Sequence, residues 1–228
     1  MAIEAAPALV NLFPAGAASV ITASDFFRSF RSSVSVDDFS ASRLFIGDKE
    51  IKPADISGVI TAVPCFFPAE FYYVNPEDRE YVCGETNAFF QYFLNELKCL
   101  KCNPPDERLF VAGAGHKLEW VRKAISLNIP LLPFHFKNVP ADQTKNGPEP
   151  ALDKCSVIFD EITNCDLPEK VQQHAKALAN TLSLSYLDCY FVQGDNKKYL
   201  LSHINTIPDI SIPKNREQIA DHFMRALM

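Results

Sequence analysis

The stretch that decides the fold runs from Tyr186 to Pro208 and reads YLDCYFVQGDNKKYLLSHINTIP. Its two apolar, aromatic-rich runs, Tyr186–Val192 and Tyr199–Ile204, predict two β-strands. The residues between them, Gln193-Gly194-Asp195-Asn196, form a suitable hairpin turn. The stretch therefore predicts an antiparallel pair of strands near the C-terminus.

The surrounding residues predict a small α+β unit. Ser156–Ile162 is typical of a further strand, and the proline and acids of Asp166-Leu167-Pro168-Glu169 favour the start of a helix. One face of that helix carries apolar residues at helical spacing: Val171, Ala175, Leu178, Ala179 and Leu182. A last helix is expected from about Asn215.

The N-terminal part alternates strand and helix patterns. The expected strands are Arg43–Ile46, Ser57–Val63, Leu109–Ala112 and a short one over Ile129–Pro133. The first expected helix follows Pro76-Glu77-Asp78 and extends to Leu97. The second runs from Gly115 to Ser126, with Leu118, Val121, Arg122 and Ile125 on its apolar face and a left-handed exit at Asn128.

Residues 138–153 hold three prolines and little apolar periodicity, which is typical of a linker. We therefore expect an α/β protein with an N-terminal α/β domain (1–136), a linker (137–154) and a C-terminal α+β segment (155–228).

The composition excludes several classes of protein. With 47% hydrophobic and 22% charged residues among 228, the chain falls in the globular range. Its net charge of −6 argues against a nucleic-acid groove, which needs clustered Lys and Arg. No apolar run approaches the roughly 20 residues that span a bilayer. Neither a nucleic acid nor a membrane is thus an expected partner.

The N-terminus and the cysteines indicate a cytoplasmic protein. Glu4 comes early and no Lys or Arg precedes Arg28, so the basic region of a signal peptide is missing. An odd number of cysteines, seven, fits reduced thiols better than a disulfide framework.

Two passages resemble a known family. The first contains Cys102-Asn103-Pro104-Pro105, Gly115-His116-Lys117-Leu118 and Ala124–Pro130. It is similar to the "N-P … N-K-x-x-x-x-x-x-A-x-x-x-G-I-P-x-P" passage of ATP-grasp ligases of the glutathione-synthetase and RimK-like branch. The resemblance implies a pre-ATP-grasp-like N-terminal domain, with Asn103 and Lys117 as candidate residues of the former nucleotide cleft.

The second passage contains Asp188, the hairpin, and Tyr199–Pro208. It resembles the closing "D-x-x … y-x-x-x-E-x-N-x-x-P" pattern of the same family, which is followed by a last helix. In that family the Asp, Glu and Asn hold magnesium against the phosphates of ATP, and oxygen ligands suit this hard cation. The resemblance implies that Asp188, His203 and Asn205 occupy those positions.

The departures from the family pattern predict a degenerate site. His203 falls at the Glu position, and neutral imidazole is a poor magnesium ligand. The family's lid and central sheet, which supply phosphate-binding lysines, have only the stretch Phe134–Cys155 in their place. Acyl-phosphate chemistry needs the γ-phosphate neutralised by metal and basic residues together. We expect neither catalytic residues nor a bound cofactor; ATP with magnesium remains the alternative.

Other residues admit simpler interpretations. Cys99-Leu100-Lys101-Cys102 has zinc-knuckle spacing but lacks a second ligand pair, so two thiols at a helix end is the plainer interpretation. Cys189 and His203 could suggest a catalytic pair, but strand alternation turns Cys189 away from Asp188, toward the helices. Aromatic residues outside the helical stripe are candidates for a partner surface: Phe26, Phe27, Phe30 and Phe90.

Two classes of function follow. The first is a non-catalytic ATP-grasp-like binding or assembly subunit, with a peptide ligand and either a second copy of itself or a larger ligase-like protein as partner. The second is an ATP-dependent carboxylate–amine ligase, or another nucleotide-binding enzyme, that a partner chain completes. The loss of a lid would leave apolar surface for an interface in either class.

Overall fold

The computed structural model describes residues 2–22, 25, 32–46, 48–62, 65–103, 114–133, 151–163, 165–194 and 197–227. It has two compact units, one of Met1–Gly113 with Ile207–Met228 and one of Ala114–Thr206. The expected strand Leu109–Ala112, most of the expected linker, and Phe26, Phe27 and Phe30 lie outside the described residues. None of the described helices combines the length and apolar character needed to cross a membrane.

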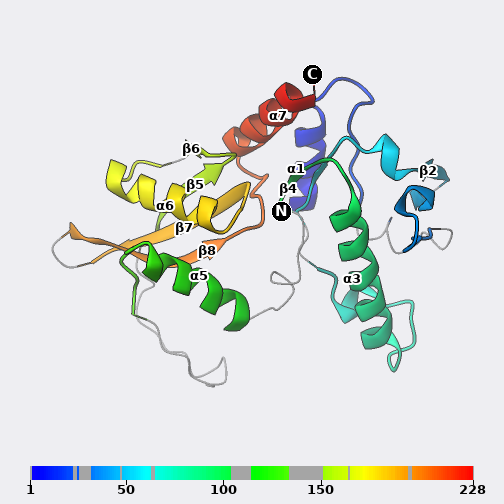
Figure 1. Cartoon of the computed structure of the whole chain (residues 1–228), viewed down its shortest axis with the longest axis horizontal. Helices are drawn as coiled ribbons and strands as arrows, with labels where there is room; N and C mark the ends of the chain where they lie inside the picture. Colours follow the sequence, from blue (N-terminus) through cyan, green and yellow to red (C-terminus); the bar gives the residue numbers. More distant parts are fainter. Residues whose placement is uncertain are drawn as a thin grey trace. The chain divides into compact units, whose positions relative to one another are not determined.

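In its described residues, the second unit is an antiparallel sheet covered by two helices (Figure 1). Its strand order is β6-β5-β7-β8. The strands are β5 (Asp153–Ile158), β6 (Glu161–Thr163), β7 (Tyr186–Gln193) and β8 (Tyr199–Asn205). The helices are α5 (Ala114–Ser126) and α6 (Glu169–Thr181). The predicted hairpin of two strands near residue 190 is thus confirmed, and the chain has the expected mixed α/β class.

The segment expected to be one strand, Ser156–Ile162, instead folds as two. β5 and β6 form a tight hairpin, and Phe159 and Asp160 at its turn have positive φ angles of 46° and 69°. Positive φ at both turn positions matches the twist of an antiparallel hairpin, but it normally needs glycine or asparagine. Phe159 is neither glycine nor asparagine, so the sequence does not indicate a turn at this position.

The core of the second unit lies between the sheet and its helices. The buried apolar residues of α6, including Leu178 and Ala179, pack against Leu187 and Cys189 of β7. The predicted apolar face of α6 is confirmed. The predicted face of α5 is rotated: Trp120, Val121 and Ala124 are buried, whereas Leu118 and Ile125 are exposed. Asn128 has the expected left-handed backbone, with φ 56°.

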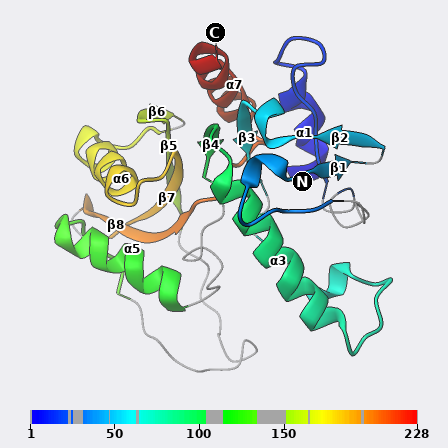
Figure 2. The ribbon, with the colours of Figure 1, turned by 45° about the vertical axis from the view of Figure 1, so that its right-hand side comes forward.

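The described residues of the first unit form two short two-stranded sheets and three helices (Figure 2). The hairpin joins β1 (Leu44–Ile46) and β2 (Lys49–Ile51); β3 (Gly58–Ile60) pairs in parallel with β4 (Leu100–Cys102). The helices are α1 (Ala2–Val10), α3 (Arg79–Glu96) and α7 (Pro213–Leu227). The described residues also include three 3₁₀ turns: η1 (Phe39–Ala41), η2 (Pro53–Asp55) and η3 (Pro68–Glu70). Helix α3 is the crossover between the parallel strands β3 and β4.

Helix α3 connects two apolar clusters of the first unit. Phe93, Leu94 and Leu97 pack with Leu44, and Cys83 packs with Phe66 and Phe71. Phe90 packs against both clusters, so it is not the exposed partner residue that its position off the helical stripe suggested.

The two units divide the chain differently from the predicted domains. Helix α5 belongs with the C-terminal sheet, because its buried residues share a core with α6. Helix α7 belongs with the N-terminal unit. The ring of Phe223, in α7, packs so closely on Gly58 of β3 that a Cβ added there would lie 2.7 Å from it. Side-chain packing, not distance along the chain, sets these boundaries.

Two glycines of the first unit should respond oppositely to substitution by alanine. Nothing lies within 4 Å of a Cβ added to Gly84 in α3, so Gly84→Ala should stabilise by about 0.5–1 kcal/mol through helix propensity. Gly58→Ala should destabilise by about 1–3 kcal/mol, because the buried Phe223 ring would have to move. Urea unfolding of both variants measures this. Equal effects of the two substitutions would contradict the packing of β3 against α7.

Candidate functional site

Alternating side chains of β7 place a polar group on the sheet face opposite α6. Leu187, Cys189 and Phe191 point into the core shared with α6. Tyr186, Asp188 and Tyr190 therefore lie on the other face. Asp188 pairs with Ser156 of β5 on one side and with Asn205 of β8 on the other. The register thus brings polar residues from three strands into one row.

Thr163 of β6 extends this row to the fourth strand, because it pairs with Ser156. The row Thr163–Ser156–Asp188–Asn205 crosses the whole sheet. The Thr163 hydroxyl is buried and has no hydrogen-bond partner within the described part of the chain. Beside the row, Tyr190 pairs with Lys154 and with His203, just before a bulge that shifts the register between Tyr190 and Phe191.

Asp188 is fully buried, and three neighbouring side chains satisfy its carboxylate. The Ser156 hydroxyl donates to Oδ1 at 2.6 Å, and the Tyr186 hydroxyl donates to Oδ2 at 2.8 Å. The Lys154 ammonium lies 2.7 Å from Oδ2 and keeps 21% of its side chain exposed. Buried carboxylates need such pairing, because unpaired charge is strongly destabilised away from water. We call Lys154, Ser156, Tyr186 and Asp188 the Asp188 cluster.

Two aromatic rings lie next to this cluster. The rings of Tyr190 and His203 stack with centroids 4.3 Å apart and planes 9° apart. Lys154 Nζ is 5.8 Å from the centroid of the Tyr190 ring, within cation–π range. His203 itself is exposed, and its Nδ1 lies 3.3 Å from the Ser202 hydroxyl. The His203 ring is therefore stacked on a tyrosine, beside the row.

The structure brings together three of the five candidate residues. Asp188 and Asn205 are direct cross-strand partners, and His203 lies two residues before Asn205 on the same strand. Asn103 belongs to the first unit, where it follows β4, is buried and has a left-handed backbone (φ 44°). Lys117 lies in α5, and its side chain is outside the described residues.

Sequence reasoning missed Lys154, Ser156 and Tyr186 as members of the site. Lys154 had been assigned to the linker, although strand alternation back from Ser156 would have placed it on the same face. Tyr186 lies two residues before Asp188 on the same strand, so alternation alone would have placed it beside the carboxylate. For Lys154 and Ser156 the pairing of β5 with β7 was the missing information, because the register shows that these two side chains meet Asp188.

The donor set does not fit the magnesium that the fold family implies. Magnesium prefers charged oxygen ligands in octahedral geometry, usually with several waters. Here the Asp188 oxygens already accept from a lysine and two hydroxyls, and the neighbouring positions hold an imidazole and one amide. Among the described residues, no three His, Cys, Asp or Glu side chains gather as a metal site. The cation at this carboxylate is the lysine ammonium.

The thiols of the second unit lie behind the sheet. Cys155 and Cys189 are cross-strand partners in the core under α6, so Cys189 faces the helices as the alternation predicted. Burial raises the pKa of both thiols well above the usual range, and nearby Cys165 raises that of Cys155 further. Burial also raises the pKa of Cys102, in β4, to about 12. A protonated, buried Cys189 does not fit a nucleophile.

These pKa shifts predict which cysteines are protected in the folded protein. Thiolates react with iodoacetamide and thiols do so only slowly, so Cys102, Cys155 and Cys189 should stay unmodified at pH 8. Half-buried Cys165 should be modified faster, and all seven cysteines should react after unfolding. Peptide mapping by mass spectrometry reads this out. Rapid native modification of Cys189 would contradict its placement.

The same shifts predict a loss of stability at alkaline pH. Unfolded thiols lose their protons near pH 8.5, whereas Cys102, Cys155 and Cys189 keep theirs in the folded state. The unfolded state then binds fewer protons than the folded state, so the free energy of unfolding falls as pH rises above about 8.5.

No protein-family model matches this sequence, and no curated protein matches it. Solved structures do match its fold. The macrocyclase MdnC bound with precursor peptide MdnA, from Microcystis aeruginosa, has a TM-score of 0.73 and 13% identity, over 97% of this chain and 96% of that chain.

Two further structures are ligases. A RiPP-associated ATP-grasp ligase from Chryseobacterium gregarium, in complex with ADP and a leader and core peptide, has a TM-score of 0.61 and 10% identity over 86% of this chain and 84% of that one. D-alanine-D-alanine ligase from Aeromonas hydrophila has a TM-score of 0.50 and 15% identity over 84% and 74%. The chain therefore has an α/β fold like that of the ATP-grasp ligases.

Proposed function

We propose that this chain is a non-catalytic, ATP-grasp-like binding or assembly subunit in the modification of a ribosomally made peptide. The observation that carries the proposal is the contact between Lys154 and Asp188. The Lys154 ammonium binds the carboxylate that, in the family pattern, would bind magnesium. With His203 in place of a Glu, the row offers too few anionic oxygens to neutralise a nucleotide's phosphates beside a metal.

The peptide part of the proposal is supported by fold neighbours. MdnC is bound with a precursor peptide, and the Chryseobacterium ligase holds a leader and core peptide. Both share this fold at low identity. A chain that keeps the fold but has lost the metal ligands would retain the capacity to hold a peptide without activating it.

The finer assignments belong to the same proposal. We assign the chain to the glutathione-synthetase and RimK-like branch, reduced in the central lid region, and place it in the cytoplasm. It would work as a homodimer or with a larger ligase-like protein. Leu118 and Ile125 of α5, both exposed, supply apolar surface for such an interface.

The alternative is a ligase or nucleotide-binding enzyme completed by a partner chain. The observation that favours it is the direct pairing of Asp188 with Asn205, which keeps two of the family's three ligand positions opposite each other. A partner that drew Lys154 away would free the carboxylate for a metal.

Co-purification from the native host tests the proposal. The tagged wild-type chain should recover a precursor peptide, a ligase-like protein, or both, and the purified chain alone should not consume ATP. A variant carrying Leu118→Ser and Ile125→Ser should lose the protein partner if α5 forms the interface. Recovery of neither peptide nor ligase-like partner by the folded wild-type chain would contradict the proposed role.

A further inference from the structure

In the described part of the chain, every exposed Phe, Tyr or Trp side chain lies between residues 67 and 81. The exposed fractions are Phe67 58%, Tyr72 67%, Tyr73 47% and Tyr81 72%. All other described Phe, Tyr and Trp residues are buried or half-buried. Two of them are in contact: the rings of Tyr72 and Tyr73 meet edge to face, with centroids 5.6 Å apart. Aromatic residues are enriched at protein interfaces, so four exposed rings within fifteen residues point to an interaction site.

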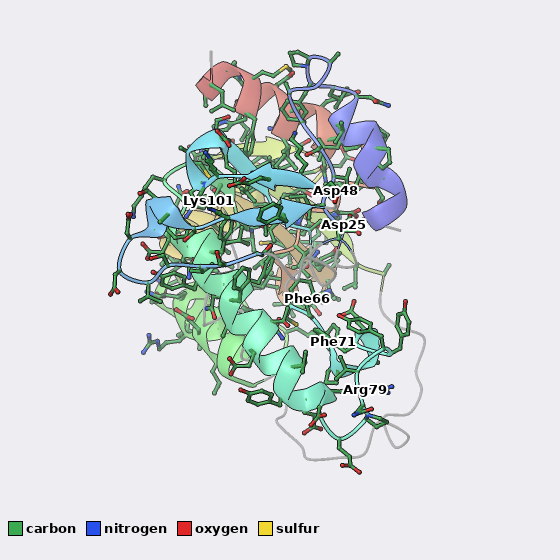
Figure 3. The ribbon with its side chains drawn as sticks, turned by 90° about the vertical axis from the view of Figure 1, so that its right-hand side faces the viewer. Asp25, Asp48, Phe66, Phe71, Arg79 and Lys101 are labelled. Carbon is green, nitrogen blue, oxygen red and sulfur yellow. The ribbon has the colours of Figure 1, made fainter. Side chains whose placement is uncertain are left out.

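Buried side chains and hydrogen bonds hold the backbone of this segment in place. Phe66 and Phe71 are buried on either side of the 3₁₀ turn η3 and pack with Cys83. The Asn87 side chain accepts from the Phe66 N–H at 2.8 Å and donates to its carbonyl at 3.0 Å. Figure 3 shows Phe66, Phe71 and Arg79 beside the N-terminal part of α3.

Arg79 fixes the second half of the segment. Its Nε donates to the Val74 carbonyl at 2.9 Å, and its Nη2 donates to the Tyr72 carbonyl at 3.0 Å. Rings presented on a backbone that is already ordered lose little conformational entropy when a partner binds. The segment is therefore pre-organised for binding.

The charges around the rings are almost all negative. Residues 67–85 contain five acidic residues, Glu70, Glu77, Asp78, Glu80 and Glu85, and one basic residue, Arg79. Their net charge is 1 − 5 = −4, and all five acids are exposed. Arg79 is engaged with backbone carbonyls. Tyr81 and Glu85 are four residues apart on α3, so they share one face of the helix.

We propose that Phe67, Tyr72, Tyr73 and Tyr81, with the surrounding acids, form a docking surface for a basic peptide segment in which arginines alternate with apolar side chains. We call it the aromatic–acidic surface. Guanidinium groups stack on aromatic faces and pair with carboxylates, so arginine complements both features. The inference concerns the first unit and goes beyond the proposed function.

The test uses the full chain and two fluorescein-labelled twelve-residue peptides. One alternates arginine with leucine, and the other has glutamine in place of each arginine. Fluorescence anisotropy at low salt should show binding of the arginine peptide and binding at least about tenfold weaker for the glutamine peptide. Raising the salt should weaken the arginine peptide most, because exposed charges are screened.

Variants separate the rings from the charges. Tyr72→Ser with Tyr81→Ser should weaken binding about tenfold or more, as expected when aromatic anchors are removed. Glu77→Gln with Glu80→Gln should weaken it and flatten its salt dependence. Arg79→Ala should weaken it by releasing the backbone below Tyr72. The matched control combines Leu12→Ser with Glu217→Gln, an exposed apolar and an exposed acidic residue of the same unit, and should bind as the wild type does.

Each variant is checked for folding by its thermal unfolding midpoint. Absence of arginine-peptide binding by the folded wild type up to about 1 mM would overturn the proposal. So would equal affinity for the two peptides, or equal losses in the control and the tyrosine variant. Those outcomes would leave the proposed function standing, because it depends on the Asp188 cluster of the other unit and is tested by ATP consumption and partner recovery.

Discussion

Lys154→Met is expected to lower the free energy of unfolding by about 3 kcal/mol. The variant removes the only cation contacting the fully buried Asp188 carboxylate among the described residues, leaving two hydroxyl donors. Breaking a buried pair by removing one partner is strongly destabilising, because the remaining charge stays buried. Such a loss costs about 3–5 kcal/mol, and the partial exposure of Lys154 places the expected value at the lower end. Urea unfolding at pH 7 measures it.

The same unit supplies a matched control. Lys176 lies 3.0 Å from Asp160, but this pair is more open to solvent, with 33% of the Lys176 and 56% of the Asp160 side chain exposed, and surface pairs contribute little. Lys176→Met should therefore change stability far less than Lys154→Met. Combining Lys154→Met with Asp188→Asn should cost less than the sum of the single variants, because the buried charge disappears. Equal losses in the two lysine variants would show that the Asp188 pair is not the buried interaction described above.

The second large effect is expected when Lys154 is removed and a carboxylate is placed at residue 203. A variant combining Lys154→Ser with His203→Glu should gain stability from Mn²⁺, which prefers the same oxygen ligands as magnesium. Removing Lys154 frees the Asp188 carboxylate. The new Glu lies two residues before Asn205, which is the cross-strand partner of Asp188. A metal that binds only the folded state stabilises it by about 2.7 kcal/mol at a hundredfold excess over its Kd.

Thermal unfolding with and without Mn²⁺ gives the measurement. The wild type should shift little, and each single variant should shift less than the double variant. A matched control with Ser202→Glu adds the same carboxylate one position away and should not reproduce the gain. If Mn²⁺ shifts the wild type as strongly as the double variant, Lys154 is not what excludes the metal.

Much of the secondary structure followed from local pattern. The apolar runs around the 193–196 turn predicted β7 and β8, and helical spacing predicted α6, because strand and helix periods differ strongly. Helix α3 follows an acidic, proline-containing start that local chemistry favours. The β5–β6 hairpin was missed because Phe159 takes a left-handed backbone that its side chain does not signal.

Side-chain partners were less accessible to sequence reasoning. Alternation put Cys189 and Asp188 on opposite faces, and the fold agrees. Which residues surround Asp188 depends on the register between β5 and β7, and no local pattern sets it. The prediction of the buried face of α5 was wrong for a similar reason. Trp120 and Leu118 are both apolar, and only the position of α6 decides which of them is buried.

The most direct test of the central claim measures release of ADP from Mg-ATP by the purified wild-type chain and by Asp188→Asn. Because Lys154 holds the Asp188 carboxylate, and because His203 stands where the proposed resemblance expects a Glu, we expect no release above buffer from either protein, with or without an arginine-containing peptide. Release by the wild type that disappears in Asp188→Asn would contradict the account and identify the chain as a working ATP-dependent enzyme.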